Sequence, residues 1–248
     1  MAASHKKLLI ILILSAALIC GGLTTWLFYN GELLFNNPST EKYPVRGIDV
    51  SAHQGVIDWK IISTQGINFA FIKATEGGAF KDKYFTQNFE QARQNGIKAG
   101  AYHFLSYDSN GESQAENFIS LVPRAEGMLP PAVDVEFYGG YDKNPVPREK
   151  AGEILNGILS RLEEYYGQKP IIYATKKSYE LYIKDGYTDY PIWIRDVFKK
   201  PALPDGRRWT FWQYTNRMKL KGYNGKEKFI DMNVFNGSAE EWNNFSGQ

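Results

Sequence analysis

The sequence predicts an α/β fold: an irregular, TIM-like β/α barrel of eight strands with several helices missing, preceded by an N-terminal transmembrane helix. Eight short apolar runs end in polar or acidic residues, and helical patterns lie between several of them. This alternation is typical of a parallel α/β sheet. The last strands follow one another too closely for full helices. An open doubly wound sheet is the alternative, although no G-x-G-x-x-G motif follows the first strand.

The apolar N-terminal segment comprises residues 8–28 (LLIILILSAALICGGLTTWLF) and carries no charge. At about 1.5 Å per residue it is about 31 Å long, enough to cross a bilayer. Two lysines precede it, which predicts a cytoplasmic stub at 1–7, a signal anchor at 8–28 and a working domain in the cell envelope. A signal peptide cleaved near 15–17, followed by secretion, and lipidation at Cys20 are the alternatives.

The rest of the chain is predicted to be a polar linker at 29–44 and a catalytic domain at 45–248. The formal net charge is +2, and the two lysines at the N-terminus account for it. A neutral domain argues against nucleic acid as a partner. The single cysteine excludes an internal disulfide, and no Cys/His cluster has the spacing of a zinc site. We therefore expect a monomer without metal or cofactor.

The elements that justify the barrel can be given in chain order. The strands are predicted at 47–51, 69–75, 99–105, 132–137, 170–175, 191–196, 209–215 and 229–235. Helices are predicted at 84–95, 111–122, 148–166 and 176–184. Asp58 resembles a helix N-cap, while Gly96 and Gly167 resemble C-caps.

Asp134 and Glu136 are the most informative residues of the fourth strand. One apolar residue separates them, and side chains at i and i+2 of a strand point to the same face about 6.5 Å apart. Paired carboxylates at this range are what glycoside hydrolysis needs, because one protonates the leaving oxygen while the other stabilises charge at the sugar. The strand therefore predicts an acid-catalysed hydrolase.

The carboxyl ends of barrel strands meet at one rim, where the chemistry of such barrels takes place. Four of the eight predicted strands bring an acid to this rim, and most bring an aromatic side chain. The candidates there are Asp49, Glu76, Tyr102, His103, Asp134, Glu136, Tyr173, Trp193, Trp212, Gln213, Tyr214 and Asp231. Aromatic faces stack on sugar rings, so this set also fits a carbohydrate cleft.

These motifs resemble the glycoside hydrolase family 25 lysozymes, the Chalaropsis-type muramidases. The similarity covers essentially the whole domain in the family's order. The matching motifs are GIDVS at 47–51, IDW at 57–59, FIKATEG at 71–77, GAYHF at 100–104, DVE at 134–136, WQY at 212–214 and DMN at 231–233. Each motif alone is weak, but the ordered set is specific.

The resemblance implies a peptidoglycan hydrolase, with glycan strands as its partner, that cleaves the β-1,4 bond between N-acetylmuramic acid and N-acetylglucosamine. Glu136 matches the general acid of the family. Asp134 matches its ionised partner, acting as nucleophile or as orienter of the substrate's acetamido group. Asp49 and Asp231 match two further acids of the site.

Substrate-binding positions follow from the same comparison and from the rim. The resemblance implies substrate contacts for Tyr102, Tyr173, Trp212 and Gln213, and the rim position adds His103, Trp193, Tyr214 and Glu76. One departure is Arg195 followed by Asp196, where relatives more often have a small residue and an aromatic.

The close pairing of Asp134 and Glu136 favours retention of anomeric configuration, because it leaves no obvious room for a water between them. Two other functions use the same architecture. One is a chitinase-like hydrolase of N-acetylglucosamine polymers, and the other is a non-catalytic barrel that binds the cell wall.

Overall fold

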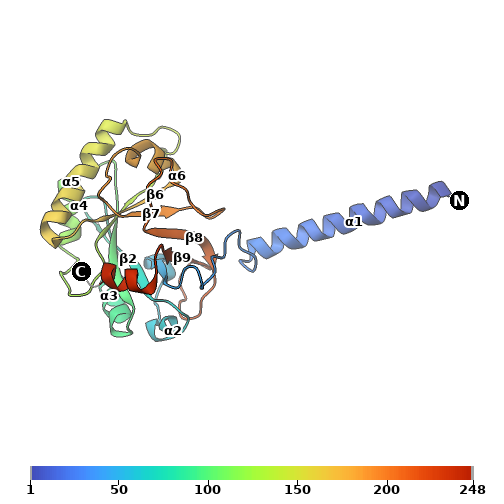
Figure 1. Cartoon of the computed structure of the whole chain (residues 1–248), viewed down its shortest axis with the longest axis horizontal. Helices are drawn as coiled ribbons and strands as arrows, with labels where there is room; N and C mark the ends of the chain where they lie inside the picture. Colours follow the sequence, from blue (N-terminus) through green and yellow to red (C-terminus); the bar gives the residue numbers. More distant parts are fainter. Residues whose placement is uncertain (1, 247–248) are drawn as a thin grey trace. The chain divides into compact units, whose positions relative to one another are not determined.

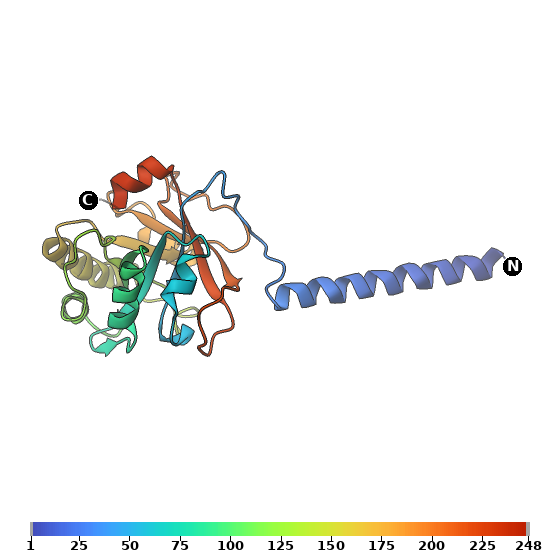
Figure 2. The ribbon, with the colours of Figure 1, turned by 90° about the horizontal axis from the view of Figure 1, so that it is seen from below.

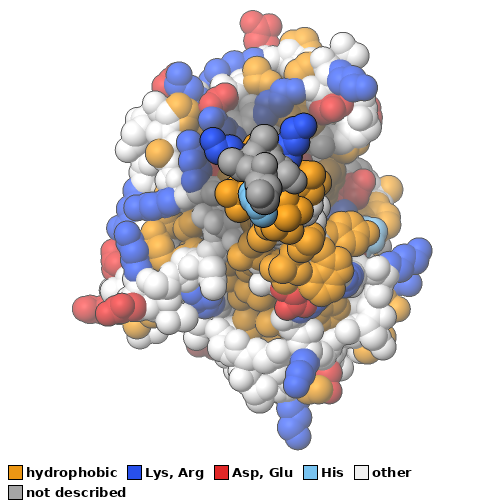
Figure 3. All heavy atoms as spheres, turned by 90° about the vertical axis from the view of Figure 1, so that its right-hand side faces the viewer, with side chains coloured by type: hydrophobic (Ala, Val, Ile, Leu, Met, Phe, Trp, Pro, Cys, Tyr) orange, Lys and Arg blue, Asp and Glu red, His pale blue; other side chains and the backbone are white. Residues whose placement is uncertain are grey.

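The computed structural model describes residues 2–246, which form two compact units. The first ends at Phe35 and the second begins at Asn36. The first unit is essentially one helix, α1 (Ala2–Tyr29). Its segment His5–Tyr29 has a mean hydropathy of 2.4 and is long and apolar enough to cross a membrane. Figure 3 looks toward the N-terminal end of α1 and shows its hydrophobic side chains in orange.

The second unit is a closed barrel, as predicted (Figure 1). Its strands are β1 (Arg46–Val50), β2 (Phe69–Glu76), β4 (Lys98–Phe104), β5 (Ala132–Val135), β6 (Ile171–Thr175), β7 (Ile192–Arg195), β8 (Phe211–Met218) and β9 (Ile230–Phe235). They pair in the order β1-β9-β8-β7-β6-β5-β4-β2, and β2 pairs with β1 to close the barrel. A two-residue strand, β3 (Phe80–Lys81), forms a hairpin with β2.

Strand β9 runs antiparallel to both of its neighbours, β1 and β8. The expectation of a parallel barrel is therefore wrong for this strand. The antiparallel direction of β9 has a local cause, because a parallel crossover needs a dozen or more residues and usually a helix. The chain between Met218 and Ile230 is shorter, so β8 and β9 form a hairpin.

Alternation along the strands separates two apolar layers. Inside the barrel, Phe69 and Phe71 of β2 pack against Phe211 of β8 and the stacked ring of Trp193. Outside it, the intervening residues pack against the helices. A glycine on β1 makes room within the barrel, since a Cβ on Gly47 would lie 2.4 Å from the Phe69 ring.

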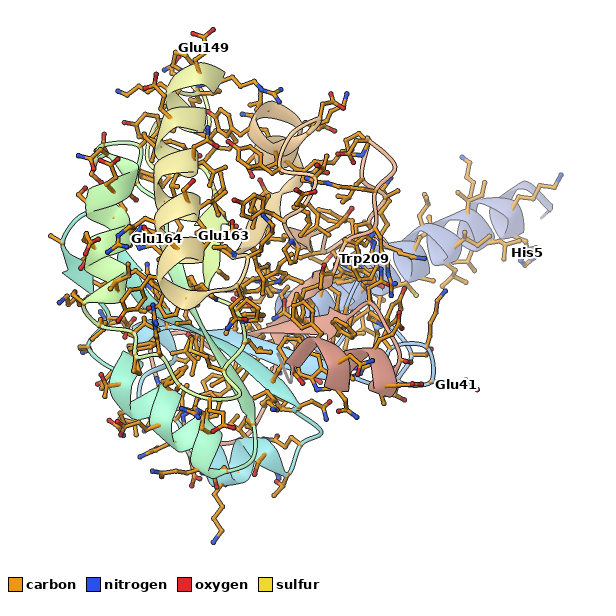
Figure 4. The ribbon with its side chains drawn as sticks, turned by 60° about the vertical axis from the view of Figure 1, so that its left-hand side comes forward. His5, Glu41, Glu149, Glu163, Glu164 and Trp209 are labelled. Atoms are coloured by element: carbon orange, nitrogen blue, oxygen red, sulfur yellow. The ribbon has the colours of Figure 1, made fainter. Side chains whose placement is uncertain are left out.

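The helices cover the outside of the barrel (Figures 1 and 2). They are α2 (Trp59–Ser63), α3 (Phe85–Gln94), α4 (Gly111–Ile119), α5 (Arg148–Tyr166), α6 (Lys176–Ser178) and α7 (Ala239–Ser246), with a π-helical turn η2 (Tyr179–Ile183) and a 3-10 turn η1 (Ala52–Gln54). Helix α5 is amphipathic: Leu155 and Ile158 are buried, whereas Glu149 and Glu164 project from its outer face (Figure 4).

The helices match the prediction except at two places. The segment predicted as one helix at 176–184 is divided between α6 and η2. The connection between β7 and β8 holds no helix, in line with the expected gaps. Helix α7 was not predicted, and its Trp242 and Phe245 pack against Phe211 and Phe235 of the interior layer.

The segment predicted as a linker, 29–44, does not behave as one piece. From Asn36 onward it belongs to the barrel unit. Tyr43 is buried against Trp209, which Figure 4 labels, and Trp212. The guanidinium of Arg46 donates a hydrogen bond to the carbonyl of Pro38. Only the few residues before Asn36 thus connect the barrel unit to α1.

Because the Phe69 ring occupies the space beside Gly47, we expect Gly47→Ala to destabilise the barrel by about 1–3 kcal/mol, the usual cost of overpacking. Chemical denaturation measures this change. The control is Gly152→Ala on α5, where the nearest atom to a new Cβ is 3.8 Å away. There alanine should gain about 0.5–1 kcal/mol from helix propensity. Equal effects of the two substitutions would contradict the packing described here.

Candidate active site

A cleft of about 650 Å³ opens at the rim formed by the carboxyl ends of the parallel strands. Interior-facing side chains of the strands line it, because residues of equal parity share one face. The acids at its floor are Asp49, Asp134, Glu136 and Asp231. All four acids predicted to be catalytic therefore lie in one cleft.

Asp49 and Asp231 face one another across the antiparallel pair β1–β9. A hydrogen bond joins their carboxyl groups. Burial and the charge on Asp49 raise the pKa of Asp231 well above its ordinary value. Burial also raises the pKa of Asp49, but hydrogen bonds from Asn233, Gln213 and Asp231 act against it. Asp49 is thus the member of the pair whose hydrogen-bond donors favour its ionised form.

Two amides hold Asp49 in place. The side-chain nitrogens of Asn233 and Gln213 donate to Asp49 Oδ2 at 2.8 Å and 2.9 Å. Asn233 Oδ1 accepts a hydrogen bond of 2.7 Å from Trp193 Nε1. These side chains are at most 8% exposed, so their partners are other protein groups. Asp49 is thus a positioned anion at the base of the cleft.

Asp134 and Glu136 differ in environment although they share a strand face. Asp134 is buried and its Oδ1 has no hydrogen-bond partner within the described residues, whereas Glu136 is half-buried. Burial, then the charge on Glu136, raises the pKa of Asp134 well above its ordinary value, and Lys73 opposes the shift. Burial of this carboxyl therefore acts against the ionised form that is expected for Asp134.

Tyr173 connects Glu136 with Gln213, the amide that binds Asp49. Its hydroxyl lies 2.8 Å from Glu136 Oε1 and 3.0 Å from Gln213 Oε1. Burial raises its pKa well above the ordinary value, and the charges on Glu136 and Asp134 add to the shift. The phenol of Tyr102, which also lines the cleft, is shifted in the same direction by burial and the charge on Asp49. Both phenols therefore remain protonated.

Comparison with known proteins identifies the family. The model of the glycosyl hydrolases family 25 matches residues 48–223. The chain belongs to this family. The match spans β1 through the hairpin after β8, and so includes three of the four acids.

Three relatives show the extent of the similarity. A solved family 25 glycosyl hydrolase from Bacillus anthracis is 53% identical, with a TM-score of 0.80 over 84% of this chain and 96% of that one. The uncharacterized protein YegX of Escherichia coli is 35% identical over 82% of this chain and 74% of its own length. Lysozyme M1 of Streptomyces globisporus is 33% identical over 79% and 69%.

Four predicted substrate-binding residues of this family 25 barrel lie outside the cleft. His103 is buried between Thr75 and Gln114, and burial lowers its pKa to about 4. Trp212 and Tyr214 belong to the outer apolar layer. Glu76 pairs with Lys73 at 2.7 Å. Of these four residues only Glu76 lies near the rim. The prediction of substrate contacts therefore needs correction for His103, Trp212 and Tyr214.

The other predicted residues, Tyr102, Tyr173, Trp193 and Gln213, do line the cleft. Several lining residues were not predicted as site residues. They include Lys73, Phe104, Phe137, Lys177, Arg195, Glu227 and Phe229. Phe104 and Arg195 stand two positions after Tyr102 and Trp193, so strand alternation is a signal that locates them. Phe229 belongs to the β8–β9 connection, which no local pattern places at the rim.

The chemistry available in the cleft is proton transfer between carboxyl groups in a partly dry site. Within residues 2–246 no three His, Cys, Asp or Glu side chains are arranged to hold a metal ion. One carboxyl, Glu136, is accessible and hydrogen-bonded to a phenol, and a second, Asp134, has a buried oxygen without a donor. Glycoside hydrolysis uses two carboxyl groups, one as an acid and one to stabilise charge at the sugar.

The raised pKa of Asp134 makes stability depend on pH. The folded state binds the proton more tightly than the unfolded chain, so wild-type stability falls as pH rises from the ordinary value of 3.8 through the raised pKa. We expect Asp134→Asn to increase the free energy of unfolding at neutral pH, with the gain vanishing below about pH 4. Thermal unfolding across this range measures it.

The matched control is Asp108→Asn. Hydrogen bonds from Tyr141 and Tyr138 lower the pKa of this exposed carboxyl, so it stabilises the fold above 3.8 and loses that contribution as pH falls. This variant should lose stability at neutral pH. If Asp134→Asn loses stability there as well, burial of Asp134 does not have the cost inferred above.

Proposed function

We propose that the chain is a muramidase, cleaving the β-1,4 bond between N-acetylmuramic acid and N-acetylglucosamine in peptidoglycan. Family membership supports a glycoside hydrolase, and Lysozyme M1 carries the activity in its name. The observation that carries the proposal is the pairing of an accessible Glu136 with a buried, unpartnered Asp134 in one cleft. The cleft's several aromatic side chains suit stacking on sugar rings.

Glu136 is the proposed general acid. It is half-exposed to the cleft, so a glycosidic oxygen can approach it, and Tyr173 holds its Oε1. Asp134 is the proposed partner that steers the substrate's acetamido group. A buried carboxylate oxygen without a donor is costly, and the acetamido N–H supplies the missing hydrogen bond. That donor favours the ionised form of Asp134 and so opposes the burial that raises its pKa.

The proposed reaction has two steps. Glu136 gives its proton to the glycosidic oxygen, the bond to the anomeric carbon breaks, and the acetamido carbonyl oxygen bonds to that carbon. Water then attacks the same carbon, giving its proton to Glu136, and the acetamido group is released. Two displacements at one carbon retain its configuration. Asp49 and Asp231 line the same cleft and contribute to the negative charge around the sugar.

Removal of the acid tests the role of Glu136. We expect Glu136→Gln to lower the release of reducing sugar from purified cell wall by at least about a hundredfold, because general acids contribute 10²–10⁴ in rate. The isosteric amide keeps the hydrogen bond to Tyr173, so the thermal unfolding curve should not change. The control is Glu153→Gln on the exposed face of α5, which should keep full activity.

A variant that retains more than about a tenth of wild-type activity would remove Glu136 from the acid role. Binding to purified wall without any release of reducing sugar by the wild type would instead indicate a wall-binding barrel.

We also propose that α1 is an uncleaved anchor that holds a monomeric barrel outside the membrane. The support is its length, its apolar composition and the two lysines before it. The full-length chain should therefore remain in the membrane fraction after a high-salt wash and enter solution only with detergent. A mature protein in the culture medium that lacks residues 1–28 would contradict the anchor.

A further inference from the structure

The hydrogen bonds beneath the cleft have a direction, and Trp193 sets it. An indole N–H donates and cannot accept. Asn233 therefore turns its oxygen toward Trp193 and its NH₂ group toward Asp49. Asp49 Oδ2 is the acceptor of this bond. Trp193 is 2% and Asn233 0% exposed, so bulk solvent does not reach these side chains to offer them a different partner.

Gln213 continues the same direction. Its NH₂ group donates to Asp49 Oδ2, which leaves Oε1 facing the Tyr173 hydroxyl at 3.0 Å. A flipped amide would bring its oxygen against an oxygen of Asp49 that already accepts from Asn233. The Gln213 side chain is 3% exposed and Tyr173 is 4% exposed. The Gln213 oxygen thus depends on the Tyr173 hydrogen for its hydrogen bond.

Tyr173 has one hydroxyl hydrogen but two oxygen neighbours, Gln213 Oε1 and Glu136 Oε1. If Glu136 carries its proton on Oε1, it donates to Tyr173, which donates to Gln213, and every contact is a hydrogen bond. Rotation of the carboxyl group about its Cγ–Cδ bond turns this O–H toward the glycosidic oxygen during the reaction. If Glu136 is ionised, it takes the Tyr173 hydrogen. The buried Gln213 oxygen then faces another oxygen without a donor, which is costly.

We propose that Gln213 is a positioning residue which, through the Tyr173 hydroxyl, holds a proton on Glu136. This inference rests on the proposed role of Glu136 as the acid. It gives Gln213 and Tyr173 a different task from the substrate contacts predicted for them. The two effects oppose one another within the acid pair. Burial favours a proton on Asp134, whereas the series of hydrogen bonds that begins at Trp193 favours a proton on Glu136.

Other charged and titratable groups also face Glu136, and the substitutions proposed below leave all of them except Tyr173 in place. Those that line the cleft are Asp49, His53, Lys73, Tyr102, Asp134, Tyr173, Lys177, Arg195, Glu227 and Asp231. Tyr107 lies behind them and also senses the charge on Glu136. A double-mutant design is therefore needed to separate the action through Tyr173 from an action through Asp49.

The test is an infrared titration of the full-length protein in detergent. The band of the protonated Glu136 carboxyl is the one that the wild type shows and Glu136→Gln lacks. Gln213→Met removes the acceptor while keeping the volume. We expect the band to disappear about one pH unit lower in this variant, because one hydrogen bond corresponds to about a tenfold change in equilibrium. The alkaline limb of the pH profile of wall hydrolysis should move by the same amount.

The decisive control repeats Gln213→Met in a Tyr173→Phe background. If Gln213 acts through the Tyr173 hydroxyl, Gln213→Met produces no further shift of the infrared band in the Tyr173→Phe background. No shift from Gln213→Met alone, or an equal shift in both backgrounds, would overturn the inference. Gln213→Leu replaces the methionine variant if the latter loses its near-ultraviolet circular dichroism. The infrared titration needs no turnover, so inactivity of the wild type would sink the proposed muramidase function while leaving this result readable.

Discussion

The antiparallel pairing of β9 between β1 and β8 is the constraint on which the site depends. Because β9 runs in reverse, its first interior residue, Asp231, lies at the same rim as the last interior residue of β1, Asp49. Its next interior residue, Asn233, lies one step deeper, where it reaches both Asp49 and Trp193. A parallel ninth strand would place Asp231 at the other end of the barrel.

The interior aromatic layer positions this network from below. Trp193 stacks on Phe71, with ring centroids 4.6 Å apart and planes 26° apart, and meets Tyr173 edge to face at 4.6 Å. These contacts fix the indole N–H that orients Asn233. Above the layer, buried carboxyl groups raise one another's pKa and cost stability at neutral pH. The fold thus combines a dense apolar floor with a destabilised acidic rim, a common relation between stability and activity.

Much of this arrangement follows from the sequence. Each of the eight apolar runs is a strand of the barrel, and the i, i+2 spacing of Asp134 and Glu136 placed both in the cleft. The errors among the predicted substrate-binding residues have one physical source, which is strand alternation: Gln213 points inward, so Trp212 and Tyr214 must point outward, and His103 likewise points away from the face of Tyr102. Applied consistently, the same rule would also have located Phe104 and Arg195.

Other features lay beyond any local pattern. The direction of β9, the packing of α7 under the barrel and the chain of hydrogen bonds from Trp193 to Glu136 all join residues far apart in the sequence. The most direct measurement of function is mass spectrometry of the fragments that the full-length protein releases from purified peptidoglycan. We expect fragments with N-acetylmuramic acid at the reducing end. Fragments that end in reducing N-acetylglucosamine, or no fragments at all, would contradict a muramidase built on Glu136 and Asp134.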